Sequence, residues 1–103
     1  LKIILLNNHR LGMVRQLQEY YCGKRYIGVD FKKNPDFIKF AQAYDAVGIR
    51  VTNPGELRLA LEQAKAAVEP VIVDCMIAPE ENVLPMVKAG RPITDVFDGS
   101  EVK

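Results

Sequence analysis

Three short apolar segments, separated by stretches of helical pattern, constrain the fold of this chain more than any other feature. They are Lys2–Asn7, Val47–Val51 and Pro70–Met76, each of strand length. Strands that alternate with helices are joined by right-handed crossovers and form a parallel sheet. We therefore predict an α/β fold, part of a three-layer parallel-sheet domain with about three strands and flanking helices.

The first apolar segment also predicts what surrounds it. Ile3–Leu6 is apolar without interruption, as in a strand that is buried on both faces and has neighbours on both sides. The chain begins inside this strand, at Leu1 and not at a methionine. We therefore expect a fragment, a processed chain or one segment of a longer protein, with the missing part upstream.

Two helices are expected between the first and second strands. The first runs from Gly12 or Met13 to Tyr21, with Met13, Leu17 and Tyr20 or Tyr21 on one face. The second has Asn34 as its cap, Pro35 at its first position and an end near Asp45. Its apolar stripe consists of Phe37, Ile38, Ala41 and Tyr44.

A third helix is expected between the second and third strands. Asn53 caps it, Pro54 occupies its first position, and Glu56 completes a capping box. The helix runs to about Ala67, and its buried stripe consists of Leu57, Ala60, Leu61 and Ala64. Prolines and a glycine then interrupt any regular pattern, which predicts a mostly irregular tail. We divide the chain into a domain part at 1–78 and a C-terminal tail at 79–103.

Composition narrows the class of protein. The chain has 103 residues, of which 49% are hydrophobic and 26% charged, with a net charge of +1. These values fit a globular piece and give no basic field for nucleic acid. No apolar run approaches the ~20 residues that a membrane-spanning helix needs. Cys22 and Cys75 form no CxxC pair, which predicts two reduced thiols.

The turn after the first strand is the place where chemistry is expected, because ligands bind at the carboxyl ends of parallel strands. It reads Asn-Asn-His-Arg-Leu-Gly from Asn7 to Gly12. An asparagine oxygen is a hard, neutral ligand for Mg²⁺ or Ca²⁺, and N–H groups at the next helix start can meet phosphate. Adjacent asparagines also serve simply as turn formers. His9, the one histidine, has no partner in the sequence and reads as a solvent-facing loop residue.

Five segments, matched in order over nearly the whole chain, carry a resemblance to a known family. They are Ile4–Gln16, Arg25-Tyr26, Asn34–Phe37, Gly48–Val51 and Pro79–Val87. Together they resemble the C-terminal part of the thiamine-diphosphate-binding domain in the large catalytic subunit of acetolactate synthase (acetohydroxyacid synthase).

This resemblance assigns cofactor roles to the first turn. It implies that the Asn8 side-chain oxygen and the Arg10 backbone carbonyl bind Mg²⁺, which bridges to the diphosphate of thiamine diphosphate. Leu11, Gly12 and Met13 are implied to lie along the diphosphate and thiazolium. The family's metal-binding aspartate and catalytic glutamate are absent, so no catalytic residue is expected in this segment. We expect the isolated chain to be inactive.

The resemblance also implies a substrate channel lined by Met13, Val14 and Leu17. The family usually has tryptophan where this chain has Leu17. Because leucine is smaller and cannot stack, we expect a weaker preference for 2-oxobutyrate over pyruvate in the parent enzyme.

The implied reaction joins the two-carbon unit of pyruvate to a second 2-oxo acid, giving acetolactate or acetohydroxybutyrate for branched-chain amino acid synthesis. Another thiamine-diphosphate carboligase or decarboxylase, or a non-catalytic α/β assembly module, are the alternatives. The resemblance implies that the complete enzyme is a homodimer or homotetramer, with or without a regulatory subunit. It also implies that any FAD in the complete enzyme binds outside this segment. Small-molecule 2-oxo acids are the expected partners, with neither nucleic acid nor membrane. The expected location is the bacterial cytoplasm, or a plastid or mitochondrion in a eukaryote.

Overall fold

The computed structural model describes residues 1–100, which divide into two units. The first unit contains Leu1–Arg10 and Phe31–Pro79, and the second contains Leu11–Asp30 and the chain from Glu80 onward. Each unit is therefore assembled from two separate stretches of chain, and each is described by itself.

The predicted division into a domain part at 1–78 and a tail at 79–103 stays a prediction, and residues 101–103 of that tail lie outside the described part. Within residues 1–100, no helix combines the length and the apolar character that crossing a membrane requires.

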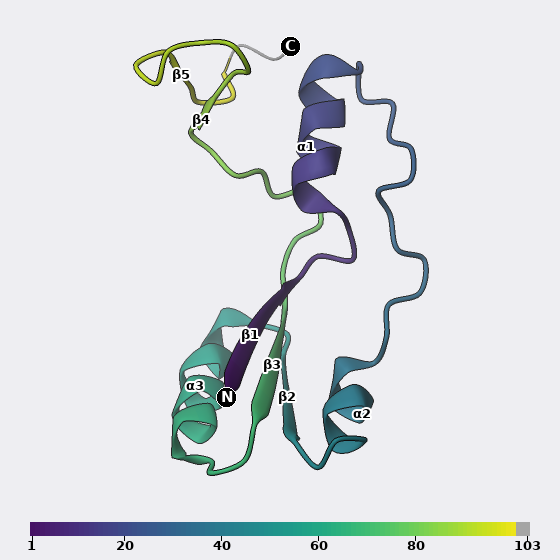
Figure 1. Ribbon diagram of the computed structural model, residues 1–103, viewed down its shortest axis with the longest axis vertical. Coiled ribbons are helices and arrows are strands. Elements are labelled where there is room, and N and C mark those ends of the chain that lie inside the picture. Colours follow the sequence, from purple (N-terminus) through teal and green to yellow (C-terminus); the bar gives the residue numbers. More distant parts are fainter. Residues whose placement is uncertain (101–103) are drawn as a thin grey trace. The chain divides into compact units, whose positions relative to one another are not determined.

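A parallel sheet forms the centre of the first unit (Figure 1). Its strands are β1 (Lys2–Asn7), β2 (Val47–Val51) and β3 (Val71–Met76), in the order β1-β3-β2. Both outer strands pair with β3 in parallel. The predicted fold class and the three predicted strands are confirmed. β3 begins one residue later than predicted, because Pro70 has no N–H to donate to the ladder.

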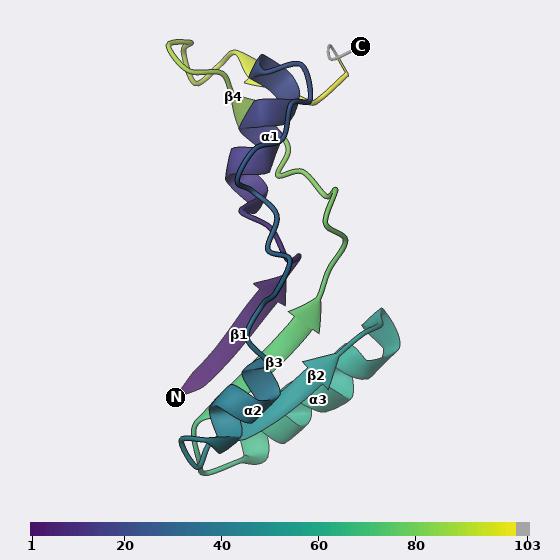
Figure 2. The ribbon, with the colours of Figure 1, turned by 90° about the vertical axis from the view of Figure 1, so that its right-hand side faces the viewer.

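One helix lies against each face of this sheet (Figure 2). These helices are α2 (Phe37–Gln42) and α3 (Pro54–Ala66). The α3 face holds the hydrophobic core, which consists of Val51, Ala60, Ala64, Val71, Val73 and Cys75. Val71 and Val73 are fully buried, and each such side chain contributes roughly 1.5–3 kcal/mol to folding.

On the opposite face, a glycine brings α2 close to the sheet. A Cβ built on Gly48 would lie 2.9 Å from the Cα of Ile38 and 3.1 Å from its carbonyl oxygen. Those contacts are with backbone, which cannot move aside as a flexible side chain can. Gly48 therefore sets the distance between β2 and α2.

β1 does not have the burial that its sequence predicts. It is an edge strand of the described sheet, and Ile3, Ile4 and Leu6 are all exposed, Leu6 at 66%. Within residues 1–100, β1 pairs with β3 on one side, and the predicted second neighbour stays a prediction. Apolar character shows that a strand can be covered, but the neighbours that cover it must come from elsewhere in the fold.

The start of α2 differs from the prediction. Asp36, and not Asn34, caps the helix, and its Oδ1 accepts the N–H groups of Ile38 at 3.1 Å and Lys39 at 3.4 Å. Asn34 donates instead to a side chain of β1. α2 ends at Gln42, short of the predicted Asp45. A tertiary contact has thus taken over the residue that local pattern assigned to the cap.

The start of α3 follows the prediction more closely. Asn53 is the N-cap and Pro54 occupies the first turn, but the Asn53 side chain makes no capping hydrogen bond. The Glu56 carboxylate accepts the N–H of Thr52 at 2.8 Å and its hydroxyl at 3.1 Å. Glu56 thus reaches back to Thr52, one residue before the cap, and the cap side chain does not bond in return, so the predicted capping box does not take its usual form. The hydrogen bonds from Thr52 lower the pKa of Glu56.

The predicted apolar stripes are buried only in part. In α3, Ala60 and Ala64 are buried, whereas Leu57 and Leu61 are exposed beside an apolar groove of about 480 Å³. Tyr44, the last residue of the predicted α2 stripe, lies beyond the helix and is exposed.

The second unit is built on α1 (Gly12–Tyr21), which matches the predicted helix. The tail contains a short antiparallel pair, β4 (Met86–Val87) and β5 (Val96–Phe97). The Tyr20 ring meets the Phe97 ring edge-on, with 5.0 Å between ring centroids. The tail is otherwise irregular as predicted within residues 79–100.

Candidate functional site

The turn that follows β1 is held by its own asparagines. The Asn8 Oδ1 accepts the N–H of Arg10 at 3.0 Å, and the Asn7 Oδ1 accepts the N–H of His9 at 3.2 Å. His9 has a φ of 57°, a left-handed conformation that is uncommon outside glycine. Its side chain is exposed, as predicted. The turn therefore has one specific shape, fixed by two local hydrogen bonds.

The oxygen atoms of this turn suit a hard cation. Asn8 is half-buried, and its amide oxygen offers two lone pairs, of which the Arg10 N–H takes one. The backbone carbonyl of Arg10 is a second neutral oxygen of the type that Mg²⁺ accepts. In residues 1–100 there is no cluster of three His, Cys, Asp or Glu side chains that could hold a metal. The turn thus fits Mg²⁺ as part of a ligand set, without a carboxylate of its own.

The beginning of α1 suits an anion. Leu11 is the N-cap and supplies no side-chain hydrogen bond, and the first turn, which begins with Gly12 and Met13, contains no acidic residue. The first N–H groups of a helix have no partner within the helix and favour negative charge. Of the three residues assigned to the cofactor here, Leu11 donates its N–H to the Val29 carbonyl at 2.9 Å. The N–H groups of Gly12 and Met13 remain the candidates for a phosphate oxygen, and the assignment stays a prediction.

α1 places its apolar residues outward and its polar residues inward. Met13, Val14 and Leu17 are exposed, whereas Arg15 and Gln16 are 2% and 1% exposed. The exposed face is the one that carries the predicted channel residues. Sequence pattern does not reveal this inversion, because apolar faces ordinarily pack inward.

The buried arginine of α1 lies in a polar network with the tail. Arg15 Nη1 donates to Glu19 at 2.8 Å, and Arg15 Nη2 donates to the Glu80 carbonyl at 3.0 Å and to Asn82 Oδ1. Asn82 Nδ2 in turn donates to Glu19 at 3.1 Å and to the Tyr20 hydroxyl at 3.0 Å. The hydrogen bond from Asn82, helped by Arg15, lowers the pKa of Glu19 against the opposing effect of desolvation.

Two glutamines of α1 each hold one backbone residue at both its N–H and its carbonyl. Gln16 accepts the N–H of Val83 at 2.8 Å and donates to its carbonyl at 2.9 Å. Gln18 makes the same pair of bonds to Ile27, both at 3.0 Å. α1 is thereby tied to the tail by Gln16 and to the following loop by Gln18.

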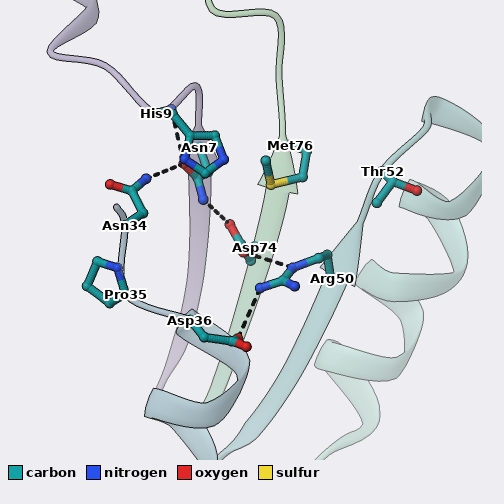
Figure 3. A pocket seen from close by; sticks show the side chains of 9 residues that line it. All are labelled: Asn7, His9, Asn34, Pro35, Asp36, Arg50, Thr52, Asp74 and Met76. Atoms are coloured by element: carbon teal, nitrogen blue, oxygen red, sulfur yellow. Dashed lines mark hydrogen bonds and ion pairs between the residues drawn. The ribbon is translucent and has the colours of Figure 1, made fainter. Parts of the chain in front are cut away.

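A cavity of about 420 Å³ opens at the carboxyl ends of the three strands in the first unit (Figure 3). Hydrogen bonds between side chains connect the polar residues of its wall one after another. Asn7 Nδ2 donates to Asp74 Oδ1 at 2.9 Å, Arg50 Nε donates to Asp74 Oδ2 at 3.2 Å, and Arg50 Nη2 donates to Asp36 Oδ1 at 3.1 Å. Asp74 is fully buried.

Sequence reasoning missed this cluster, although one signal was present. Asp74 interrupts an otherwise apolar strand, and a charge in such a place requires a partner. Arg50 lies opposite Asp74 in the register of β2 and β3. The hydrogen bonds from Lys39, Ile38 and Arg50 lower the pKa of Asp36, although desolvation acts in the opposite direction.

Both cysteines are free thiols, as predicted. Cys22 is half-buried and Cys75 is buried on β3. Burial, assisted by the charge of the adjacent Asp74, raises the pKa of the Cys75 thiol. Neither residue belongs to a metal cluster within residues 1–100.

Comparisons with known proteins agree with this architecture. A family model described as "Thiamine pyrophosphate enzyme, C-terminal TPP binding domain" matches residues 1–75. The acetolactate synthase large subunit of Cyanidium caldarium is 37% identical over 92 residues, which is 88% of this chain and 16% of that protein.

Two further relatives have similar names. The probable acetolactate synthase large subunit of Methanococcus aeolicus is 38% identical over 96 residues, 93% of this chain and 16% of that protein. The acetolactate synthase isozyme 2 large subunit of Escherichia coli is 35% identical over 98 residues, 95% of this chain and 18% of that protein. The chain thus spans less than a fifth of the length of these relatives.

Proposed function

Because the chain belongs to the thiamine pyrophosphate enzymes, whose C-terminal cofactor-binding domain it matches, we propose that it is the distal part of that domain in an acetolactate synthase large subunit. The observation that carries the proposal is the Asn8 turn. It lies at the carboxyl end of β1, within the matched residues 1–75. The identity of 35% to 38% with acetolactate synthase large subunits supports this reading over a decarboxylase.

In this proposal, Asn8 and Arg10 supply two ligands to Mg²⁺. The side-chain oxygen of Asn8 is held by the Arg10 N–H, so it is oriented before any metal arrives. Pre-orientation lowers the ordering cost of binding. The remaining ligands, including the carboxylate that this turn lacks, come from another part of the complete enzyme.

The start of α1 serves the diphosphate and its exposed face serves the substrate. Gly12 and Met13 offer backbone N–H groups without a side-chain cap, which favours a phosphate group there. The Leu11 N–H donates to the Val29 carbonyl at 2.9 Å, so Leu11 is proposed to lie along the cofactor without binding the phosphate through its N–H. Met13, Val14 and Leu17 form an exposed apolar strip suited to the walls of a channel for small 2-oxo acids.

When bound, thiamine diphosphate supplies the carbanion chemistry by which pyruvate loses CO₂ and its two-carbon unit joins a second 2-oxo acid. The residues of this chain hold the metal, orient the diphosphate and exclude water beside the channel. None of them is proposed to transfer a proton to the substrate. We propose no catalytic residue in this segment.

The remaining features of the complete enzyme are proposals that rest on the family resemblance alone. We propose a homodimer or homotetramer, with or without a regulatory subunit, located in the bacterial cytoplasm. FAD, where the enzyme has it, binds outside this segment. The reaction serves branched-chain amino acid synthesis.

A product assay tests the proposal. The complete enzyme that carries this segment is incubated with pyruvate, thiamine diphosphate and Mg²⁺, and the products are identified by NMR. Acetolactate is expected. Acetaldehyde as the main product would instead support a 2-oxo acid decarboxylase, and no consumption of pyruvate would support a non-catalytic assembly module.

A binding assay tests the partial nature of the site. Calorimetric titration of the isolated 103-residue chain with thiamine diphosphate and Mg²⁺ is expected to show no tight binding. Micromolar or tighter affinity would contradict a site that is completed by other parts of the enzyme.

A further inference from the structure

We propose that Asp74 and Asn7 are positioning residues for the Asn8 turn, so that a buried carboxylate on β3 tunes the affinity of the enzyme for Mg²⁺. The proposal rests on the proposed role of Asn8 as a metal ligand. Neither residue touches the metal in this account. Both act through the backbone that carries Asn8.

The orientation of the Asn7 amide carries the first step. Its Nδ2 donates to Asp74 Oδ1 at 2.9 Å, and the two residues are 6% and 0% exposed. If the amide were rotated by half a turn, its oxygen would face the carboxylate at the same distance and repel it. Asp74 therefore determines that the oxygen of Asn7 points to the turn and its nitrogen to β3 (Figure 3).

The oxygen of Asn7 then fixes the peptide group that follows Asn8. It accepts the N–H of His9 at 3.2 Å, and this N–H belongs to the same peptide unit as the carbonyl of Asn8. His9, the residue after this peptide unit, has a φ of 57°. A second donor, Asn34 Nδ2 at 3.0 Å, holds the same oxygen in place. The path from Asp74 to the ligand residue thus consists of two hydrogen bonds.

The carboxylate is itself held in one orientation. Arg50 Nε donates to Asp74 Oδ2 at 3.2 Å, while Asn7 donates to the other oxygen. Arg50 also contacts Asp36, the cap of α2. Each oxygen of Asp74 therefore has its own donor, and the two donors come from the strands on either side.

The position of the network argues for more than support of the fold. A buried ion pair is often no more stabilising than apolar residues of the same size. This one lies at the carboxyl edge of the sheet, where β1 passes into the Asn8 turn. Outer residues that orient metal ligands typically change metal affinity when they are replaced.

An exchange of the two residues provides the test. In Asp74→Asn, a single oxygen must serve both Asn7 and Arg50, which donate to different atoms of the carboxylate. In Asn7→Asp, two carboxylates are buried against each other. In the double variant, Asn at position 74 donates to Asp at position 7 and accepts from Arg50, so every partner is restored with the donor reversed.

The measurement is the dissociation constant for Mg²⁺ of the complete enzyme at saturating thiamine diphosphate, followed by protein fluorescence. Each single variant is expected to raise it about 10-fold to 100-fold. The double variant is expected to return to within about threefold of the parent, because coupled pairs are not additive. Val73→Ala, a core change on the same strand and the opposite face, should lower the Tm and leave the constant unchanged.

The outcomes separate this inference from the proposed function. If Asn8→Ala leaves Mg²⁺ affinity unchanged, Asn8 is no ligand, and both fail. If Asn8→Ala weakens Mg²⁺ binding while Asp74→Asn lowers only the Tm, the metal site stands and the positioning role is overturned. A double variant as weak as the product of the two single losses also overturns it.

Discussion

Gln16 is expected to control the attachment of the tail to α1, and replacing it with alanine should release the Val83 amide. Gln16 is 1% exposed and makes two hydrogen bonds to the backbone of Val83, at 2.8 and 2.9 Å. Its Nε2 also lies 3.3 Å from the sulfur of Met86. Alanine removes all of these contacts and leaves the fold of α1 intact, because alanine is the best helix former.

The size of the effect follows from the two backbone bonds. Each contributes about 1 kcal/mol net, so the loss is about 2 kcal/mol. Every 1.4 kcal/mol corresponds to a factor of ten, so hydrogen exchange at Val83 should become about 30-fold faster if exchange proceeds by local opening. The assay is hydrogen–deuterium exchange resolved at single amides by NMR or by fragmentation mass spectrometry.

Gln18 offers a matched control on the same helix. It holds Ile27 by the same pair of bonds, but these are exposed to solvent and should contribute less. Gln18→Ala should therefore speed exchange at Ile27 and leave Val83 unchanged, while Gln16→Ala should do the reverse. The reasoning is refuted if Val83 exchanges at the same rate in the parent and in both variants.

Three further predictions concern the channel, the sheet and a helix cap. Leu17→Trp in the complete enzyme should increase the preference for 2-oxobutyrate over pyruvate, measured by product ratios in a competition assay. It should also strengthen the binding of planar channel-blocking inhibitors, measured by inhibitor titration, and no change in either quantity would count against the assigned channel. Gly48→Ala should lower the free energy of unfolding by about 1–3 kcal/mol, because the new methyl group meets the backbone of Ile38, and an unchanged urea midpoint would contradict this. The hydrogen bonds from Thr52 hold the pKa of the Glu56 carboxylate below its ordinary value of 4.5, so they should stabilise the fold fully above that pH and be lost as the pH falls through the lower folded value. The stability difference between the parent and Glu56→Gln should therefore shrink on acidification, and a difference that grows would contradict the cap.

The sequence predicts the elements of this fold better than their surroundings. The alternation of strands and helices predicts the parallel sheet correctly, because the spacing of apolar residues within each element indicates its type. The exposure of Leu6 on β1 could not be predicted in the same way, because it depends on which strand takes the centre of the sheet. The local sequence pattern assigned Asn34 as a helix cap, but its side chain donates instead to the Asn7 side chain, 27 positions away.

In the candidate site, too, some residues could be predicted from the sequence and others depend on contacts between distant parts of the chain. Asn8 and Arg10 were assigned as metal ligands through resemblance, since two asparagines after a strand are ambiguous by themselves, and this assignment stays a prediction. The inward face of α1 was not found, because Gln16 is buried by a partner 67 positions away. Asp74 could have been predicted as part of a buried polar cluster, since a charge inside an apolar strand requires a partner.

Location of the metal in the complete enzyme tests the central claim most directly. Crystals grown with thiamine diphosphate and Mn²⁺ in place of Mg²⁺ would reveal the cation by its anomalous scattering. The account predicts the cation at roughly 2 Å from both the Asn8 Oδ1 and the Arg10 carbonyl oxygen, the distance at which such ions bind oxygen. A cation bound to the cofactor without either of these atoms would contradict it.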